Sequence, residues 1–303
     1  MTRLQKTTWH HLAFEAMAWN KSAEAYRPFE IFTAQFSSAA VEELLEVPQR
    51  LMDVAAGTGA STFAVCEKLA KLCREGERTA KVVATDFSEA MLQTLSQKLS
   101  SEESPDSFAT VKAIQEGLLQ VSAELADAQD LSKYDAGSFD AVTCTFGIMF
   151  PPSPEKVVRE FWRLLKPGGV AITTTWHYNN SVADILPDLA HEFMGRGRFE
   201  ELPLVASTLK FGTETYMRRL FRGDLGDSKL WSDKDMELRF VSGSATCLPR
   251  HVAAMLNKNP VSADLGTWDE ALAERRLEEK WANEAGEIKL QGTALILVAR
   301  KPA

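Results

Sequence analysis

Three acidic residues stand at or near the ends of short apolar segments and are the first candidates for ligand chemistry. They are Asp53 within segment 51–54, Asp86 at the end of segment 81–86, and Asp127 directly after segment 121–126. A carboxylate accepts hydrogen bonds from hydroxyl and amino groups of a ligand. If the apolar segments are parallel strands, their carboxyl ends meet at the edge of the sheet where ligands bind. Asp86, at the end of its segment, is therefore placed to accept hydrogen bonds from both hydroxyls of a ribose.

Two glycines, Gly57 and Gly59, follow the first apolar segment, and residues 62–72 have the pattern of a helix. We expect Ser61 or Thr62 to be the N-cap of this helix. Glycine permits positive φ and close approach of the backbone to a ligand, and a helix N-terminus presents free N–H groups. A tight turn that binds nothing is the alternative. A dinucleotide fingerprint would need a third glycine at position 62, which is Thr62.

The acid four residues before the first of two glycines resembles the first motif of the class I S-adenosylmethionine (SAM)-dependent methyltransferases. The string from Thr85 to Leu92 is similar to the second motif of that family. The string from Ser138 to Gly169 is similar to its small-molecule branch, which includes the ubiquinone- and menaquinone-biosynthesis methyltransferases. The resemblance covers about residues 45–177. It implies SAM as cofactor and methyl transfer to an O, N or C nucleophile of a small metabolite.

The resemblance also implies roles for single residues. Asp86 would bind the ribose hydroxyls, Met91 would flank the adenine, and Asp127 with the Ala128 N–H would bind the adenine edge. Tyr26 would lie near the carboxylate of SAM or near the substrate. The implied cofactor-binding set is Tyr26, Asp53, Ala55, Gly57, Gly59, Asp86, Phe87, Met91, Asp127, Ala128 and Thr145. Taken alone, Asp86 could instead be a helix cap and Asp127 a turn residue.

Aromatic residues near the expected carboxyl edge suggest the walls of an acceptor pocket. The substrate-binding candidates are Trp19, Phe146, Met149, Trp176 and Tyr178. Such walls suit an apolar or aromatic small molecule. They would also suit a cationic amine through cation–π contact, so the chemistry of the nucleophile stays open.

His177 directly follows the fifth expected strand and is the candidate general base, with His10 and His11 as alternatives. His191 shares a helix face with Asp184 and Asp188, which could suggest a metal site or simply a solvated face. Metal-dependent relatives of the catechol type carry acids after strands four and five. This chain has Cys144 and His177 near those positions, and we predict no metal.

The remaining periodic segments complete an α/β pattern. Strands are expected at 139–145, 170–176 and 237–241, and a last strand at 289–300 would pair antiparallel with 237–247. We therefore expect a doubly wound, seven-stranded, mostly parallel sheet with an antiparallel last strand, the Rossmann-like methyltransferase fold. We expect one domain, divided into an N-terminal lid of two or three helices (1–47), a SAM-binding core (48–177), a helical substrate cap (178–234) and the C-terminal part of the sheet (235–303).

The amino-acid composition limits the classes of binding partner that we expect. The 303 residues carry 34 Lys and Arg against 42 Asp and Glu, a net charge of −8, without a basic run. This argues against nucleic acid and anionic membranes as partners. The four cysteines form no CxxC pair, and neither a signal peptide nor a stretch of membrane-spanning length is evident. A cytoplasmic protein with a small-molecule substrate is expected, and the oligomeric state is open.

Two other classes of protein remain as alternatives. The first is a methyltransferase-like subunit that binds SAM and acts as a regulator or scaffold without turnover. It would be favoured if the chain's own side chains filled the acceptor pocket. The second is an NAD-dependent oxidoreductase, which would explain an acid after the second strand. It would not explain Asp53 or Asp127, and it would need the missing third glycine.

Overall fold

The computed structural model describes residues 3–44, 46–101, 107–194, 209–226, 229–258 and 268–303, with side chains from residue 19 onward apart from those of 24, 27, 28, 190 and 194. Its seven strands are β1 (Arg50–Val54), β2 (Ala80–Asp86), β3 (Leu119–Leu125), β4 (Phe139–Thr145), β5 (Leu165–Asn180), β6 (Met236–Cys247) and β7 (Ile288–Arg300). They form one sheet in the order β3-β2-β1-β4-β5-β7-β6. β1 to β5 pair in parallel, and β7 runs antiparallel to both β5 and β6. The predicted sheet is confirmed.

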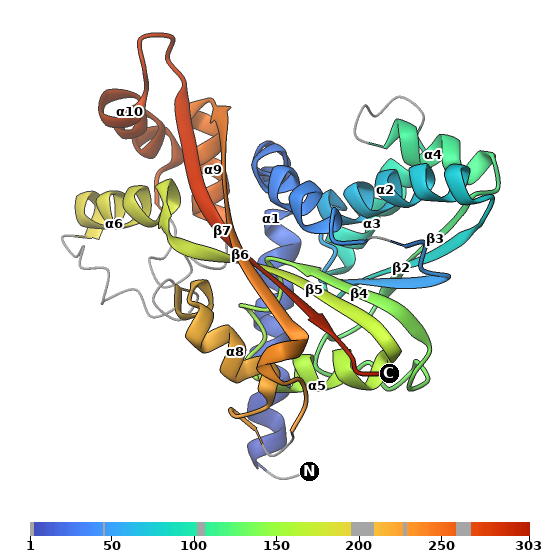
Figure 1. Cartoon of the computed structure of the whole chain (residues 1–303). Helices are drawn as coiled ribbons and strands as arrows, with labels where there is room; N and C mark the ends of the chain where they lie inside the picture. Colours follow the sequence, from blue (N-terminus) through green and yellow to red (C-terminus); the bar gives the residue numbers. More distant parts are fainter. Residues whose placement is uncertain (1–2, 45, 102–106, 195–208, 227–228, 259–267) are drawn as a thin grey trace.

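Helices cover both faces of the sheet, which is why its central strands are apolar almost throughout. Leu51, Met52 and Val54 of β1, for example, are all buried. α2 (Ala60–Gly76), α3 (Glu89–Leu99) and α4 (Phe108–Gln115) lie on one face, and α5 (Pro154–Leu164) and α8 (Glu214–Arg222) lie on the other (Figure 1). Three buried clusters on these faces form the core.

One helix, α1 (Arg3–Val41), occupies the N-terminal region where the sequence predicted two or three. Its 39 residues correspond to roughly 60 Å of helix. The side chains of Phe29, Phe32 and Phe36, spaced three and four residues apart, are all buried, so this part of the helix packs against the rest of the protein. In Figure 1, α1 passes behind the sheet, between the helices around β1 to β3 and those at the far end of β6 and β7.

The second group of helices consists of α6 (Ser181–Met194), α9 (Pro249–Lys258) and α10 (Glu270–Trp281), gathered at one end of the long β6–β7 ribbon (Figure 1). The helices predicted at 184–194 and 213–221 are found as α6 and α8. The described residues also contain two short 3-10 helices, η2 (Lys210–Gly212) and η3 (Asp233–Asp235). Residues 195–208 and 227–228 of the predicted cap lie outside the described part, and the capping role stays a prediction.

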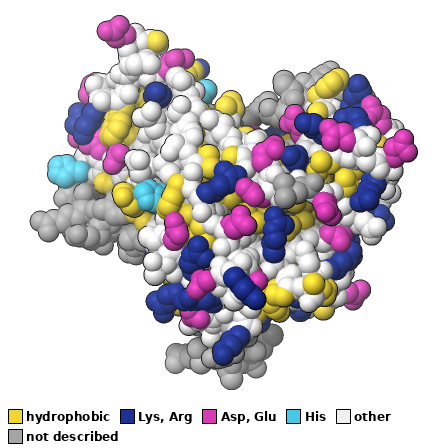
Figure 2. All heavy atoms as spheres, in the orientation of Figure 1, with side chains coloured by type: hydrophobic (Ala, Val, Ile, Leu, Met, Phe, Trp, Pro, Cys, Tyr) yellow, Lys and Arg dark blue, Asp and Glu magenta, His cyan; other side chains and the backbone are white. Residues whose placement is uncertain are grey.

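The surface shown in Figure 2 carries Lys and Arg side chains interspersed with Asp and Glu side chains. Among the described helices, none combines the length and the apolar character needed to cross a bilayer. All four cysteines are buried.

Candidate active site

A cavity of about 110 Å³ lies at the carboxyl ends of β1 to β4, where the strand order reverses between β1 and β4. The predicted site residues that line it are Trp19, Tyr26, Ala55, Gly57, Asp86, Phe87, Met91, Asp127, Ala128, Thr145 and Phe146. The fold thus brings together residues from five distant stretches of the chain. Asp53, Gly59, Met149, Trp176, His177 and Tyr178 do not line the cavity.

The glycine loop between β1 and α2 holds its backbone in the left-handed region at several positions. Ala55 has φ 56°, Gly57 φ 56° and Gly59 φ 106°. A Cβ at Gly59 would lie 2.7 Å from side-chain atoms of both Leu95 and Phe63, so packing as well as conformation requires glycine there. Gly59 is also the N-cap of α2. The predicted caps, Ser61 and Thr62, are therefore wrong, and their hydroxyls are used elsewhere.

Those hydroxyls bind Asp53. Ser61 Oγ and Thr62 Oγ1 each donate to Asp53 Oδ2 at 2.7 Å, and Thr143 Oγ1 donates to Asp53 Oδ1 at 2.8 Å. The carboxylate is completely buried, and burial raises its pKa despite the three donors. Asp53 thus ties β1 to the first turn of α2 and to β4, behind the cavity wall. This explains how a carboxylate is accommodated inside an apolar strand.

Asp86 is the acid that faces the cavity. Its Oδ2 accepts from the Gly57 N–H at 2.9 Å, and its Oδ1 accepts from the Ser88 N–H at 2.8 Å. Burial raises the pKa of Asp86 to about 6, with the hydrogen bonds acting in the opposite direction. Ser88 is the N-cap of α3, and its side chain accepts from the Met91 N–H. Asp86 is therefore not the cap residue of α3, and its side chain lines the cavity.

Asp127 and Ala128 line the cavity after β3, next to Gln129. The Gln129 N–H donates to Asp127 Oδ1 at 2.9 Å, and Gln129 Nε2 lies 3.2 and 3.3 Å from the two carboxylate oxygens. Gln129 Oε1 accepts from the Ser153 N–H at 3.0 Å, which connects this loop to the start of α5. Gln129 therefore orients Asp127 relative to the segment that follows β4.

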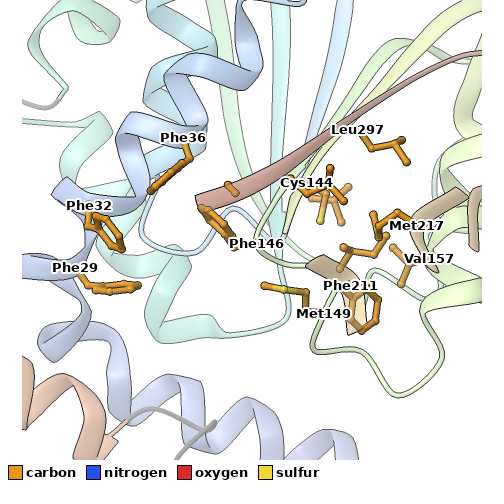
Figure 3. Packing of buried hydrophobic residues seen from close by; sticks show 14 of the residues in the cluster. Phe29, Phe32, Phe36, Cys144, Phe146, Met149, Val157, Phe211, Met217 and Leu297 are labelled. Atoms are coloured by element: carbon orange, nitrogen blue, oxygen red, sulfur yellow. The ribbon is translucent and has the colours of Figure 1, made fainter. Parts of the chain in front are cut away.

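A belt of aromatic rings in mutual contact lies beside the cavity, and its members Trp19, Tyr26, Phe146 and Phe150 line the cavity. Phe29, Phe32 and Phe36 project from α1 toward Phe146 (Figure 3). Phe146 stacks on Trp176 with centroids 3.9 Å apart, and Phe32 stacks on the same indole at 5.4 Å. At the other end of the belt, Trp19 contacts Phe150 with centroids 5.0 Å apart. Burial raises the pKa of Tyr26, also in the belt, so its hydroxyl remains a donor.

The belt decides which predicted substrate residues reach the cavity. Trp19 and Phe146 do, whereas Trp176 lies behind Phe146 and is surrounded by the aromatic rings of α1. Met149 is buried, and its sulfur accepts a hydrogen bond from the backbone N–H of Trp176 at 3.5 Å. Tyr178 is 66% exposed. For Met149, Trp176 and Tyr178, the structure shows no contact with the cavity.

None of the histidines with a described side chain lines the cavity. His177 Nδ1 accepts from the Asn179 N–H, and its ring packs on Tyr178 and Phe240. Burial lowers the pKa of His177. The side chains of His10 and His11 lie outside the described part. On α6, Asp188 is bound by Lys280 and Trp281, and within the described residues no three potential metal ligands come together.

Sequence reasoning missed several residues of the cavity wall, namely Thr33, Ser37, Thr58, Gln129, Phe150 and Pro151. Thr33 and Ser37 continue the helical spacing that starts at Tyr26, and this periodicity was a usable signal. Thr58 lies inside the glycine loop. Gln129 lies two residues after a predicted site acid.

The sheet order, the glycine loop and the acids after β2 and β3 define the class I methyltransferase architecture. Residues 52–173 match the family described as "Methyltransferase domain", so this part of the chain is a methyltransferase domain. Over 121 residues the chain is 38% identical to a demethylmenaquinone methyltransferase of Clavibacter sepedonicus, covering 40% of this chain and 38% of the relative. A protein of the same name from Deinococcus radiodurans is 33% identical over 132 residues, covering 44% and 45%.

These matches leave part of each relative unaligned, because the chain spans less than half the length of either. Among solved structures, the YcgJ protein of Bacillus subtilis aligns with 89% of this chain and 99% of its own, at 15% identity and a TM-score of 0.48. The predicted resemblance to the quinone-biosynthesis branch is confirmed for the core that carries the motifs.

Proposed function

We propose that this protein transfers a methyl group from SAM to a small, largely apolar or aromatic acceptor. The observation that carries this proposal is the composition of one cavity. One side presents the glycine loop with Asp86 and Asp127, and the other presents the aromatic rings of Trp19, Phe146 and Phe150. Both relatives are named for demethylmenaquinone, which is a member of this acceptor class.

The residues present fit SAM as the cofactor. Thr58 Oγ1 is buried and has no hydrogen-bond partner in the described structure, although Thr58 lines the cavity. A buried hydroxyl without a partner is costly, and a polar ligand would satisfy it. The N-terminus of α2 presents Ala60 and Ser61 at the same wall, where a carboxylate would be favoured. Asp86 and Asp127 would accept from the ribose hydroxyls and the adenine amino group.

SAM supplies an electrophilic methyl group on its sulfonium. The protein's contribution is to hold donor and acceptor in line and to exclude water, and such positioning can supply several kcal/mol of the barrier. Thr145 and Phe146, at the carboxyl end of β4, both line the cavity. Because His177 does not line the cavity, we assign it no role as base and expect His177→Asn to retain turnover.

Calorimetry with SAM, S-adenosylhomocysteine and NAD tests the cofactor. We expect both adenosyl ligands to bind and NAD not to bind. Asp86→Ala should weaken the adenosyl ligands by at least tenfold, about 1.4 kcal/mol, through loss of charge-assisted hydrogen bonds. Glu89→Ala removes an exposed carboxylate three residues away and should leave affinity unchanged. Equal affinity of the Asp86 variant and the wild type would remove the ribose assignment.

A second candidate, a SAM-binding subunit without turnover, is favoured by one observation. Trp176, expected in the acceptor pocket, is stacked between Phe146 and Phe32 of the chain itself. Incubation with SAM and a panel of quinols, phenols and amines separates the candidates. Formation of S-adenosylhomocysteine with any acceptor supports the enzyme. Tight cofactor binding with no product from the whole panel would favour the subunit.

A further inference from the structure

We infer that Glu30 and Lys98 form a clasp that couples the docking of α1 to cofactor binding through Thr58. This inference rests on the proposed function, because it needs a ligand beside the glycine loop. The clasp consists of these two side chains and the carbonyl group of Thr58. It joins three separate elements, namely α1, α3 and the loop between β1 and α2.

All three donors of the Lys98 ammonium are engaged. Lys98 Nζ donates to Glu30 Oε1 at 2.9 Å, to Glu30 Oε2 at 2.7 Å and to the Thr58 carbonyl at 3.2 Å. The side chains of Lys98 and Glu30 are only 11% and 8% exposed. A buried ion pair gains little net stability, because desolvation offsets the attraction, but its geometry is specific. Such a pair is therefore better explained by a requirement for position than by stability.

Thr58 is the residue whose position Lys98 fixes. It lies between Gly57 and Gly59, and both glycines have positive φ, so its flanking backbone torsions have unusually wide freedom. The ammonium bonded to the Thr58 carbonyl restricts the orientation of this peptide. The same residue places an unpartnered, buried hydroxyl at the cavity wall. Lys98 is therefore a positioning residue for Thr58.

The other end of the clasp belongs to a helix that builds the cavity. Tyr26, Thr33 and Ser37 of α1 line the cavity, and Glu30 is spaced four and three residues from the first two. When α1 is docked, it both completes the wall and supplies the partner of Lys98. A ligand that binds Thr58 and this wall favours the docked helix, and by linkage the docked helix favours the ligand to the same extent.

The double variant Glu30→Gln/Lys98→Met tests the coupling without leaving one buried charge unpaired. A matched control is Glu42→Gln/Lys68→Met. This double substitution removes a 2.6 Å ion pair between Glu42, which directly follows α1, and Lys68 of α2. Neither residue lines the cavity. Calorimetry gives the affinity for S-adenosylhomocysteine. Hydrogen exchange of residues 29–41, with and without this ligand, reports the docking of α1.

In the wild type and in the control variant, we expect the ligand to slow exchange of residues 29–41. In the clasp variant, affinity should fall about tenfold or more, and the ligand should no longer slow this exchange. Wild-type affinity together with wild-type protection in a folded clasp variant would overturn the inference. Failure of the wild type itself to bind would instead overturn the proposed function, and the coupling with it.

Thr58→Val gives a second test that leaves both members of the ion pair in place. The substitution is close to isosteric and removes only the unpartnered hydroxyl. We expect weaker binding of S-adenosylhomocysteine, while exchange of residues 29–41 without ligand stays as in the wild type. Unchanged affinity in this variant would remove Thr58 from the coupling, even if the clasp variant failed to fold.

Discussion

The Asp86 carboxylate accepts a hydrogen bond from the Gly57 N–H at 2.9 Å, although 29 residues separate the two in the chain. The bond joins the end of β2 to the glycine loop and fixes both halves of the cofactor side of the cavity. Its strength depends on the charge of Asp86, because a carboxylate accepts more strongly than a neutral acid. Protonation of this one group should therefore affect both binding and loop order.

Binding of S-adenosylhomocysteine should depend on pH near 6. Burial raises the pKa of Asp86 to about 6, so the carboxyl group loses its charge below that pH. We expect affinity at pH 5 to be up to about tenfold lower than at pH 8. Calorimetry at both pH values measures this difference, with Asp86→Asn as the control that should bind weakly and lack this transition. An affinity constant across this range would contradict the role of Asp86.

Without ligand, the raised pKa of Asp86 makes the folded protein more stable at low pH, whereas cofactor binding is expected to be weaker there. Since the pKa of Asp86 in the folded state lies above its ordinary value of 3.8, the folded protein binds more protons than the unfolded chain in this range. The contribution of Asp86 to the free energy of unfolding is therefore fully present below pH 4 and lost as pH rises through about 6. Urea unfolding of wild type and Asp86→Asn at several pH values isolates it. If the difference between the two does not change with pH, the raised pKa is wrong.

Asp53 should stabilise the fold rather than bind the cofactor directly. Asp53→Ala leaves three buried hydroxyls without their acceptor and should cost about 3 kcal/mol. Asp53→Asn should cost about 1 kcal/mol or less, because hydroxyl groups can rotate to accept from the amide. Urea unfolding measures both. A stable Asp53→Asn protein with tenfold weaker cofactor binding would instead support the ligand contact that the sequence predicted.

Gly147 should not tolerate a side chain. A Cβ there would lie 2.3 Å from the Ala55 Cβ and 3.0 Å from Cys144 Sγ, so Gly147→Ala would push β4 and the glycine loop apart. Overpacking of this kind costs about 1–3 kcal/mol. Cofactor affinity should fall as well, because Ala55 and Gly147 both line the cavity.

Gly76→Ala is a suitable control for Gly147→Ala, because its Cβ would meet nothing nearer than 3.8 Å. Thermal unfolding and calorimetry of the two variants should therefore differ clearly. Equal stability of Gly147→Ala and wild type would show that the two strand ends can separate without cost.

Gln129 should affect cofactor binding because it orients Asp127. Gln129→Leu removes the side-chain amide that lies against both oxygens of Asp127 and frees the Ser153 N–H. We expect affinity for S-adenosylhomocysteine to fall by about three- to tenfold, which corresponds to a hydrogen bond of about 1 kcal/mol. Gln97→Leu, on the exposed surface of α3, is the control. Wild-type affinity in Gln129→Leu would mean that Asp127 needs no such support.

The amino-acid sequence was sufficient to predict the sheet and two acids that line the cavity. Apolar segments of strand length, the two glycines and the acids after them are local signals that lie close together in the chain. They located β1 to β4 to within about two residues, and they placed Asp86 and Asp127 correctly at the cavity. The sequence did not predict the structural role of Asp53, because the hydroxyl of Thr143 reaches Asp53 only through the pairing of β1 with β4.

Only the tertiary structure decided the acceptor side. Aromatic residues on α1 and β5 gave no sequence signal for which rings would face the cavity and which would stack on one another. Packing of α1 across the sheet placed Trp176 behind Phe146 and brought Glu30 to Lys98. Local sequence can specify a strand, a turn and an acid, because each depends on neighbouring residues. The wall of this cavity depends on contacts between residues far apart in the chain, and those arise only when the elements pack.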